Sequence, residues 1–297
     1  MTSPSRAFPS RPRRSMLYMP ASNARALEKA KTIAADGLIF DLEDAVAPDA
    51  KVAARGAAVG AVQSGVYGKR EVMIRANGLD TPWGRDDLTA IATSGAHGVV
   101  LPKVNDADDV RIAADVLHAA GAPDTLAIWA MMETPMGILN ARDIAEASPR
   151  LAGFCVGTAD LAKDLHCAHP SDRAPMLMAL QTCILVARAY GLYVLDGVHV
   201  QLDDEAGYEA ACRQGRALGF DGKTLIHPKQ VDIANGVYAP SPEELARAQR
   251  LVDAHKEAAA KGHGVTTLDG RLVEVLHVEE AKRLIKYADD IAALAGA

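Results

Sequence analysis

Residues 126–140 read LAIWAMMETPMGILN, and residues 153–165 read GFCVGTADLAKDL. Each stretch begins with an apolar run, meets polar residues where that run ends, and continues into a segment typical of a helix. Apolar strands that alternate with helical segments are the pattern of βαβ units, in which the strands run parallel and are buried. These two stretches therefore predict consecutive units of a parallel α/β fold.

The same alternation recurs along most of the chain. The starts of the apolar runs lie roughly 20–40 residues apart, which leaves room for a crossover helix each time. No G-x-G-x-x-G follows the first run to favour an open dinucleotide-binding sheet. The predicted fold class is therefore α/β, a (β/α)8 TIM barrel with a C-terminal helical extension. We expect its strands at residues 16–19, 37–43, 71–77, 98–103, 126–133, 153–158, 193–198 and 222–227.

The predicted barrel occupies residues 15–236 and is flanked by two further segments. Residues 1–14 contain four arginines, three prolines and no acid. This composition favours a flexible arm over an organelle transit peptide, because the prolines oppose an amphipathic helix. Residues 237–297 predict a helical extension, with one helix beginning at SPEE (241–244) and another over 277–294, separated by a DG turn (269–270). We expect this extension to act as a lid over a site.

The composition is typical of a soluble α/β protein. Hydrophobic residues make up 49% of the chain and aromatic residues 4%, which suits strands packed by aliphatic side chains. The net charge of −6 and the absence of a long apolar run argue against nucleic acid and membrane as partners. The four cysteines have no C-x-x-C spacing, so we expect no zinc site, no disulfides and a cytoplasmic location.

Ionisable residues gather where the predicted strands end. Active sites of this architecture are built at the C-terminal ends of the strands, so residues far apart in sequence should meet in one pocket. The residues at these ends are Asp41, Glu43, Asp44, Arg75, Lys103, Glu133, Asp160, Asp196 and His227.

Glu133 and Asp160 are the predicted metal ligands. Carboxylate oxygens favour Mg²⁺, with Mn²⁺ as a substitute, and a Mg²⁺ site commonly uses one or two protein carboxylates with water and substrate. The alternative is that these acids cap helices or form salt bridges. For Glu43 and Asp44, a supporting role beside the site is left open next to direct function.

The cationic and imidazole groups at the strand ends have two interpretations each. Arg75 can clamp a carboxylate or stabilise an enolate oxygen, or it can form an ion pair across the barrel mouth. Lys103 can support Glu43 or form a Schiff base with a carbonyl substrate. His227 can be a functional group or a hydrogen-bonded strand end.

Several segments together resemble the citrate lyase beta-subunit and malyl-CoA lyase family, which are CoA ester lyases within the HpcH/HpaI aldolase superfamily. Their order and spacing, which span most of residues 14–240, make the resemblance specific. The segments are RSMLYMPASN (14–23), GLIFDLEDAVAPDAKVAAR (37–55), IRANGLDTPWGRDDL (74–88), VVLPKV (99–104), METPMGILN (132–140), GTADLAKDL (157–165), LDG (195–197) and RALGFDGKTLIHPKQV (216–231).

The resemblance implies a set of site residues. It implies Mg²⁺ bound by Glu133 and Asp160, and a substrate carboxylate and carbonyl held by Arg75, Glu133 and the backbone around Ala159. It also implies that Tyr18 contacts coenzyme A.

Two further positions follow from the resemblance and carry departures from it. Lys29 matches a residue that contacts coenzyme A, whereas a basic residue common in related lyases is Asn23 here. Family members bring a C-terminal aspartate over the site, often from a neighbouring subunit, and Glu274 occupies that place in this chain. The resemblance thus implies Glu274 as the acid and a homotrimer or homohexamer.

The expected function is that of a Mg²⁺-dependent carbon–carbon lyase. It would cleave or form a β-hydroxyacyl-CoA of the malyl-CoA, methylmalyl-CoA or citramalyl-CoA type, with an oxo acid and an acyl-CoA on the other side of the reaction. One alternative is a malyl-CoA thioesterase. Another is a citrate lyase beta subunit that works with acyl-carrier partners.

Overall fold

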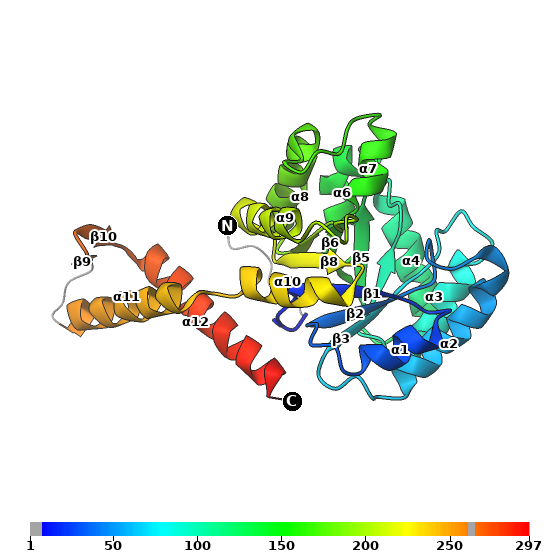
Figure 1. The fold of residues 1–297 in the computed structure, drawn as a ribbon, viewed down its shortest axis with the longest axis horizontal. Coiled ribbons are helices and arrows are strands. Elements are labelled where there is room, and N and C mark those ends of the chain that lie inside the picture. Colours follow the sequence, from blue (N-terminus) through cyan, green and yellow to red (C-terminus); the bar gives the residue numbers. More distant parts are fainter. Residues whose placement is uncertain (1–7, 261–264, 297) are drawn as a thin grey trace. The chain divides into compact units, whose positions relative to one another are not determined.

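The computed structural model describes residues 8–260 and 265–296 and divides the chain into two compact units (Figure 1). Of the described residues, the larger unit contains 8–9 and 13–238, and the smaller contains 10–12 and 239–296. Within the described residues, no helix is both long and apolar enough to cross a membrane.

The larger unit is a closed barrel of eight parallel strands. Each strand pairs with the next in sequence, and β1 pairs with β8 through Ser15 to Lys223 and Leu17 to Leu225, which closes the barrel. The predicted fold class is confirmed. The strands are β1 (Ser15–Pro20), β2 (Gly37–Asp41), β3 (Glu71–Arg75), β4 (Gly98–Leu101), β5 (Ala127–Met132), β6 (Leu151–Val156), β7 (Tyr193–Asp196) and β8 (Gly222–Leu225).

Helices surround the strands, as Figure 1 shows. Successive residues of a strand point to opposite faces, so each strand supplies side chains both to the barrel interior and to the layer under the helices. Met16, Ile39 and Trp129 belong to one buried cluster, whereas their neighbours such as Leu17 and Phe40 belong to another. The helices are α1 (Ala24–Ala30), α2 (Lys51–Gln63), α3 (Gly84–Ala92), α4 (Ala107–Ala119), α5 (Pro135–Leu139), α6 (Ala141–Glu146), α7 (Thr158–Asp164), α8 (Leu177–Ala189), α9 (Glu205–Leu218) and α10 (Val231–Tyr238).

The segment before β1 is held at the N-terminal ends of the strands. Arg13 is buried, forms an ion pair of 2.5 Å with Glu71, and lies 4.1 Å from the ring centre of Tyr193. Arg14 pairs with Asp36 at 2.7 Å. We expected a flexible arm over residues 1–14, and this is wrong for Arg13 and Arg14, because buried acids at the strand starts bind their guanidinium groups. Residues 1–7 lie outside the described residues.

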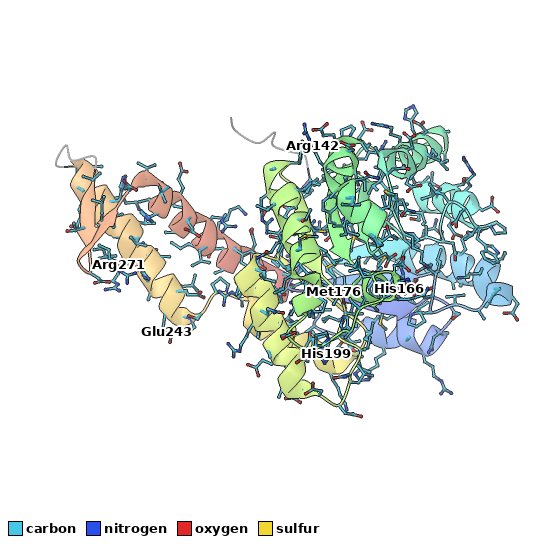
Figure 2. The ribbon with its side chains drawn as sticks, turned by 90° about the horizontal axis from the view of Figure 1, so that it is seen from above. Arg142, His166, Met176, His199, Glu243 and Arg271 are labelled. Atoms are coloured by element: carbon cyan, nitrogen blue, oxygen red, sulfur yellow. The ribbon has the colours of Figure 1, made fainter. Side chains whose placement is uncertain are left out.

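The smaller unit consists of two helices and a hairpin. Helix α11 (Pro242–Ala260) is followed by strands β9 (Thr266–Leu268) and β10 (Arg271–Val273), which pair antiparallel, and then by α12 (Val275–Ala295). Ala248 and Val252 on α11 share a buried cluster with Val273, Val278 and Ala281. Figure 2 shows the side chains of this unit, with Glu243 at the start of α11 and Arg271 on β10. Its role as a lid stays a prediction.

Candidate active site

A pocket of about 440 Å³ opens at the C-terminal ends of the strands. It joins residues from seven of the eight strands or the loops that follow them, as expected for this architecture. Six of the predicted site residues line it together, and they come from five of the barrel's βα repeats: Tyr18, Asp44, Arg75, Glu133, Ala159 and Asp160. The complete lining is Tyr18, Pro20, Asp41, Asp44, Ala45, Arg75, Met131, Glu133, Val156, Gly157, Thr158, Ala159, Asp160, Val198, Thr224 and Ile226.

Glu133 is the first residue after β5 and is 1% exposed. Its Oε1 accepts a hydrogen bond of 2.8 Å from the backbone N–H of Lys103. Gly157 provides the space for the carboxylate, because a Cβ atom at that position would lie 2.3 Å from Glu133 Oε2. Burial raises the pKa of Glu133 to about 7, and the charge of Asp160 contributes to the rise.

Asp160 lies in the first turn of α7, three residues after Gly157. The structure does not support the alternative that Glu133 and Asp160 serve as helix caps. Thr134 caps α5, with its Oγ1 accepting a hydrogen bond of 3.0 Å from the N–H of Gly137. The N-cap of α7 is Gly157. Both acids are therefore available to a ligand in the pocket.

The donor set fits a hard divalent cation. The pocket and the residues in contact with it contain five acids and two cations. When the acids are ionised, these seven residues carry a net charge of −3: Asp41, Glu43, Asp44, Glu133, Asp160, Arg75 and Lys103. Among the described residues, no three His, Cys, Asp or Glu side chains form a metal cluster. Two carboxylates in an open pocket match the way proteins bind Mg²⁺, which keeps positions for water and substrate.

Arg75, the last residue of β3, is fixed on one side and open to the pocket on the other. Its Nε and Nη2 donate to the two carboxylate oxygens of Asp41, each at 2.7 Å, and its Nη1 lies 2.7 Å from Glu43 Oε2. The guanidinium also lies over the ring of Tyr18, with 4.8 Å from Cζ to the ring centre. Such two-point pairing holds the planar group in one orientation.

Asp41 is one of the strand-end residues expected at the pocket, and its role there as the partner of Arg75 follows from the structure. The strand register places Asp41 directly opposite Arg75, at the ends of β2 and β3. Opposite charges at the last positions of neighbouring strands would have indicated this pair.

Glu43 and Asp44 differ in position although they are adjacent. Glu43 is buried between two cations, because its Oε1 accepts a 2.9 Å hydrogen bond from Lys103 Nζ while its Oε2 faces Arg75. Asp44 is exposed and lines the pocket. A catalytic role for either acid stays a prediction.

The contact between Lys103 and Glu43 bears on the Schiff-base alternative. The hydrogen bond to Glu43 raises the pKa of the Lys103 amine above its usual value. A protonated amine is a poor nucleophile. The geometry therefore favours a supporting role for Lys103.

The residues expected to contact coenzyme A lie in different places. Tyr18 lines the pocket, and burial raises the pKa of its phenol well above the usual value. Lys29 is exposed on α1 and is not among the pocket-lining residues. Asn23 caps α1, with its side chain accepting from the N–H of Ala26 at 3.1 Å. Asn23, which stands where related lyases commonly have a basic residue, thus has a local structural role as a helix cap.

Two polar strand ends do not join the pocket. Asp196 is fully buried and forms ion pairs with Arg173 at 2.6 Å and Lys223 at 2.9 Å. His227 caps a short helical turn, with Nδ1 accepting from the N–H of Lys229 at 3.2 Å. The expectation that all the strand-end groups meet in one pocket is wrong for these two, because local partners bind them; Glu43 and Lys103 do not line the pocket either, but they contact Arg75 and Glu133, which do.

Glu274 belongs to the smaller unit, where it is exposed at the start of α12. Its backbone N–H donates to His277 Nδ1 at 3.1 Å, which fixes the helix start. Its carboxyl chemistry in the reaction stays a prediction.

Comparison with known proteins agrees with the motifs and the barrel. Residues 14–228 match the HpcH/HpaI aldolase/citrate lyase family. The chain is 49% identical to a (3S)-malyl-CoA thioesterase of Cereibacter sphaeroides, over 97% of this chain and 98% of the relative. It is 36% identical to the citrate lyase subunit beta of Escherichia coli, over 94% of each.

Solved structures extend the comparison to three dimensions. The protein CitE from Mycobacterium tuberculosis, in complex with magnesium, acetoacetate and coenzyme A, is similar with a TM-score of 0.76 and 29% identity, over 94% of this chain and 99% of that one. A citrate lyase from Burkholderia xenovorans, at 18% identity and a TM-score of 0.81, shares the fold. The resemblance inferred from the sequence motifs is confirmed. The chain belongs to the HpcH/HpaI aldolase/citrate lyase family.

Proposed function

We propose that the protein is a Mg²⁺-dependent carbon–carbon lyase of β-hydroxyacyl-CoA esters, of the malyl-CoA, methylmalyl-CoA or citramalyl-CoA type. The observation that carries the proposal is the meeting of Glu133, Asp160 and Arg75 in one pocket at the C-terminal end of the barrel. The magnesium, acetoacetate and coenzyme A bound by the relative CitE support the same substrate class.

Each group has a defined part in the proposed reaction. Mg²⁺ held by Glu133 and Asp160 would supply Lewis-acid stabilisation of the substrate's hydroxyl and carboxylate oxygens. In the cleavage direction the Glu274 carboxylate would accept the hydroxyl proton, the hydroxyl carbon would become the carbonyl of the oxo acid, and the electrons of the carbon–carbon bond would leave the thioester fragment as an enolate. Arg75 faces the pocket in a fixed orientation, so its guanidinium can stabilise the enolate oxygen. Glu274 would then protonate the enolate carbon.

A panel of hydroxyacyl-CoA esters tests the proposal directly. The protein is incubated with each ester and Mg²⁺, and both fragments are identified by mass. We expect an oxo acid and an acyl-CoA in equal amounts, and loss of turnover in Glu133→Ala and Asp160→Ala. Normal turnover by either variant would contradict the proposed metal site.

A malyl-CoA thioesterase is the second candidate, and the 49% identical relatives of that name favour it. The same enolate chemistry could precede attack by water on the thioester. Malate without glyoxylate in the product mixture would indicate hydrolysis, whereas glyoxylate with acetyl-CoA would indicate a lyase.

A citrate lyase beta subunit is the third candidate, supported by the 36% identical relative. Such a subunit would need an acyl-carrier protein and a transferase partner. The purified chain would then have no activity on coenzyme A esters and become active when the partners are added.

A homotrimer or homohexamer, with Glu274 supplied by a neighbouring subunit, is the assembly we propose for the lyase.

A further inference from the structure

Lys103 has a backbone conformation that is uncommon for a residue with a side chain. It follows β4 and Pro102, and its φ of 50° lies in the left-handed region. Residues other than glycine adopt this region rarely, and such conformations concentrate at functional sites. Contacts around Lys103 must therefore compensate for this conformation.

The backbone of Lys103 is attached to the loop that carries Glu133. Its N–H donates to Glu133 Oε1 at 2.8 Å, and its carbonyl accepts a 3.1 Å hydrogen bond from the side chain of Asn105. Asn105 is bound in turn to the other loop, by Thr134 Oγ1 at 2.7 Å and by the side-chain amide of Asn140 at 2.9 Å. These bonds fix the loops after β4 and β5 to each other.

The side chain of Lys103 reaches in another direction. Its Nζ donates to Glu43 Oε1 at 2.9 Å, and Glu43 Oε2 faces Arg75 Nη1 at 2.7 Å. The backbone of Glu43 is fixed separately, since its carbonyl accepts a 2.7 Å hydrogen bond from Lys51 Nζ. Lys103 thus determines where the Glu43 carboxylate lies, and Glu43 is one of the two acids that orient Arg75.

We propose that Lys103 is a positioning residue that sets the location of Arg75 relative to Glu133. Its backbone holds the carboxylate through a direct hydrogen bond, and its ammonium holds the guanidinium through Glu43. The inference rests on the proposed function, in which these two groups act on opposite parts of one substrate. The left-handed conformation is what lets one residue make both contacts.

Three single variants separate the side-chain contact from the backbone contact. Lys103→Met keeps the N–H to Glu133 and removes the ammonium, so we expect kcat to fall about 10- to 100-fold. Calorimetry should find the Mg²⁺ dissociation constant within about threefold of the wild-type value, since the Glu133 contact remains. Lys103→Arg, which can still pair with Glu43, should recover most of kcat. Lys163→Met, a change at an exposed lysine of α7, is the matched control and should leave kcat unchanged.

A double-mutant cycle tests whether Lys103 acts through Glu43. If it does, the variant with both Lys103→Met and Glu43→Gln should be no slower than the slower single variant. Losses that multiply, or a kcat of Lys103→Met within twofold of wild type, would overturn the inference. Should Lys103→Met fold poorly, Lys103→Gly is used instead, because glycine adopts a positive φ without strain.

Two readouts do not depend on lyase activity. A crystal structure of Lys103→Met should show Glu43 and the Arg75 guanidinium displaced while Glu133 keeps its place. Pyruvate binding in the presence of Mg²⁺ should weaken about tenfold in the same variant, as a loosened charged contact implies. If wild type cleaves no ester, the proposed function fails, and these measurements still decide the role of Lys103. Unchanged side-chain positions together with unchanged pyruvate binding would refute it.

Discussion

The Glu133 carboxyl is almost fully buried beside a second acid, with a backbone amide as its hydrogen-bond donor. A carboxyl in such a place is held protonated more strongly than in water, unless a cation binds to it. The pKa of about 7 in the metal-free protein thus reflects a site that favours either a proton or a cation.

The first prediction concerns the pH dependence of stability in the metal-free protein. The pKa of Glu133 is about 7 in the folded protein and 4.5 as its ordinary value, so the folded state binds more protons across that window, and stability falls as the pH rises through it. Glu133→Gln should be more stable than wild type at pH 8 by on the order of 3 kcal/mol, and similar to it at pH 4.5. Urea unfolding in EDTA at both pH values measures this, and a pH-independent difference would argue against it.

The second prediction concerns Arg75. Lysine keeps the charge but cannot pair with both oxygens of Asp41 while facing the pocket. Arg75→Lys should lower kcat/KM about 100- to 1000-fold, as removal of a charge-stabilising donor does. Mg²⁺ binding, measured by calorimetry, should be nearly unchanged, because Arg75 donates no hydrogen bond to Glu133 or Asp160 among the described contacts.

Position at the end of a strand was enough to predict that some residues line the pocket, while their roles stay predictions. Glu133 and Arg75 were chosen because they end apolar strands, and both line the pocket. Asp196 ends a strand as well, yet it pairs with Arg173, which a loop distant in sequence supplies. Ion-pair partners of this kind are set by tertiary contacts, so a local sequence pattern does not predict them. The exposed position of Lys29 likewise depends on how α1 lies against the barrel.

At the scale of elements, the close approach of β5 and β6 makes the acid site. The loop after β6 must pass Glu133 without a side chain, and Gly157 meets this need. The eight strands were predictable because short runs that are mostly apolar or β-branched alternate with helical segments, even though β8 includes Lys223. The β9–β10 hairpin was not predicted as strands, although its DG turn was recognised. Each strand has three residues, which is too short to show an alternation of apolar and polar side chains.

The third prediction tests this approach of β5 and β6. In Gly157→Ala the new Cβ would lie 2.3 Å from Glu133 Oε2 and 2.6 Å from Glu133 Cβ, so the carboxylate must move. Mg²⁺ affinity should fall at least about tenfold, in line with the loss from disturbing a metal ligand's support. Gly56→Ala in α2 is the matched control, because nothing lies within 4 Å of a Cβ there, and it should bind Mg²⁺ like wild type. Equal affinities for all three proteins would count against the metal site.

At the scale of the barrel unit, the two ends have separate tasks. The C-terminal ends of the strands hold the pocket, and the N-terminal ends are closed by Arg13 against Glu71 and Tyr193. Conserving one end for chemistry and the other for stability is the general division in this architecture. The sequence could not predict this closure, because an arginine-rich start resembles a disordered arm until its acidic partners are placed.

The fourth prediction separates the two ends. Arg13→Ala leaves the buried Glu71 carboxylate without its cation, so the free energy of unfolding should fall by about 3–5 kcal/mol. The folded fraction should keep its KM, because the change lies at the opposite end from the pocket. Lys69→Ala, at an exposed position near β3, is the control for a lost positive charge. Urea unfolding and steady-state kinetics measure the two effects, and a raised KM with unchanged stability would contradict the division.

Closure at the N-terminal end, together with an interior filled by Met16, Trp129 and Leu195, means that a ligand reaches the pocket from the C-terminal ends of the strands and not through the barrel. A reaction that forms two products in such a pocket requires them to leave by the same route. Under the proposed function, an oxo acid bound to the buried Glu133 and Arg75 would lie deeper than the bulky thioester and would leave after it. Product release would then be ordered, with the acyl-CoA dissociating before the oxo acid.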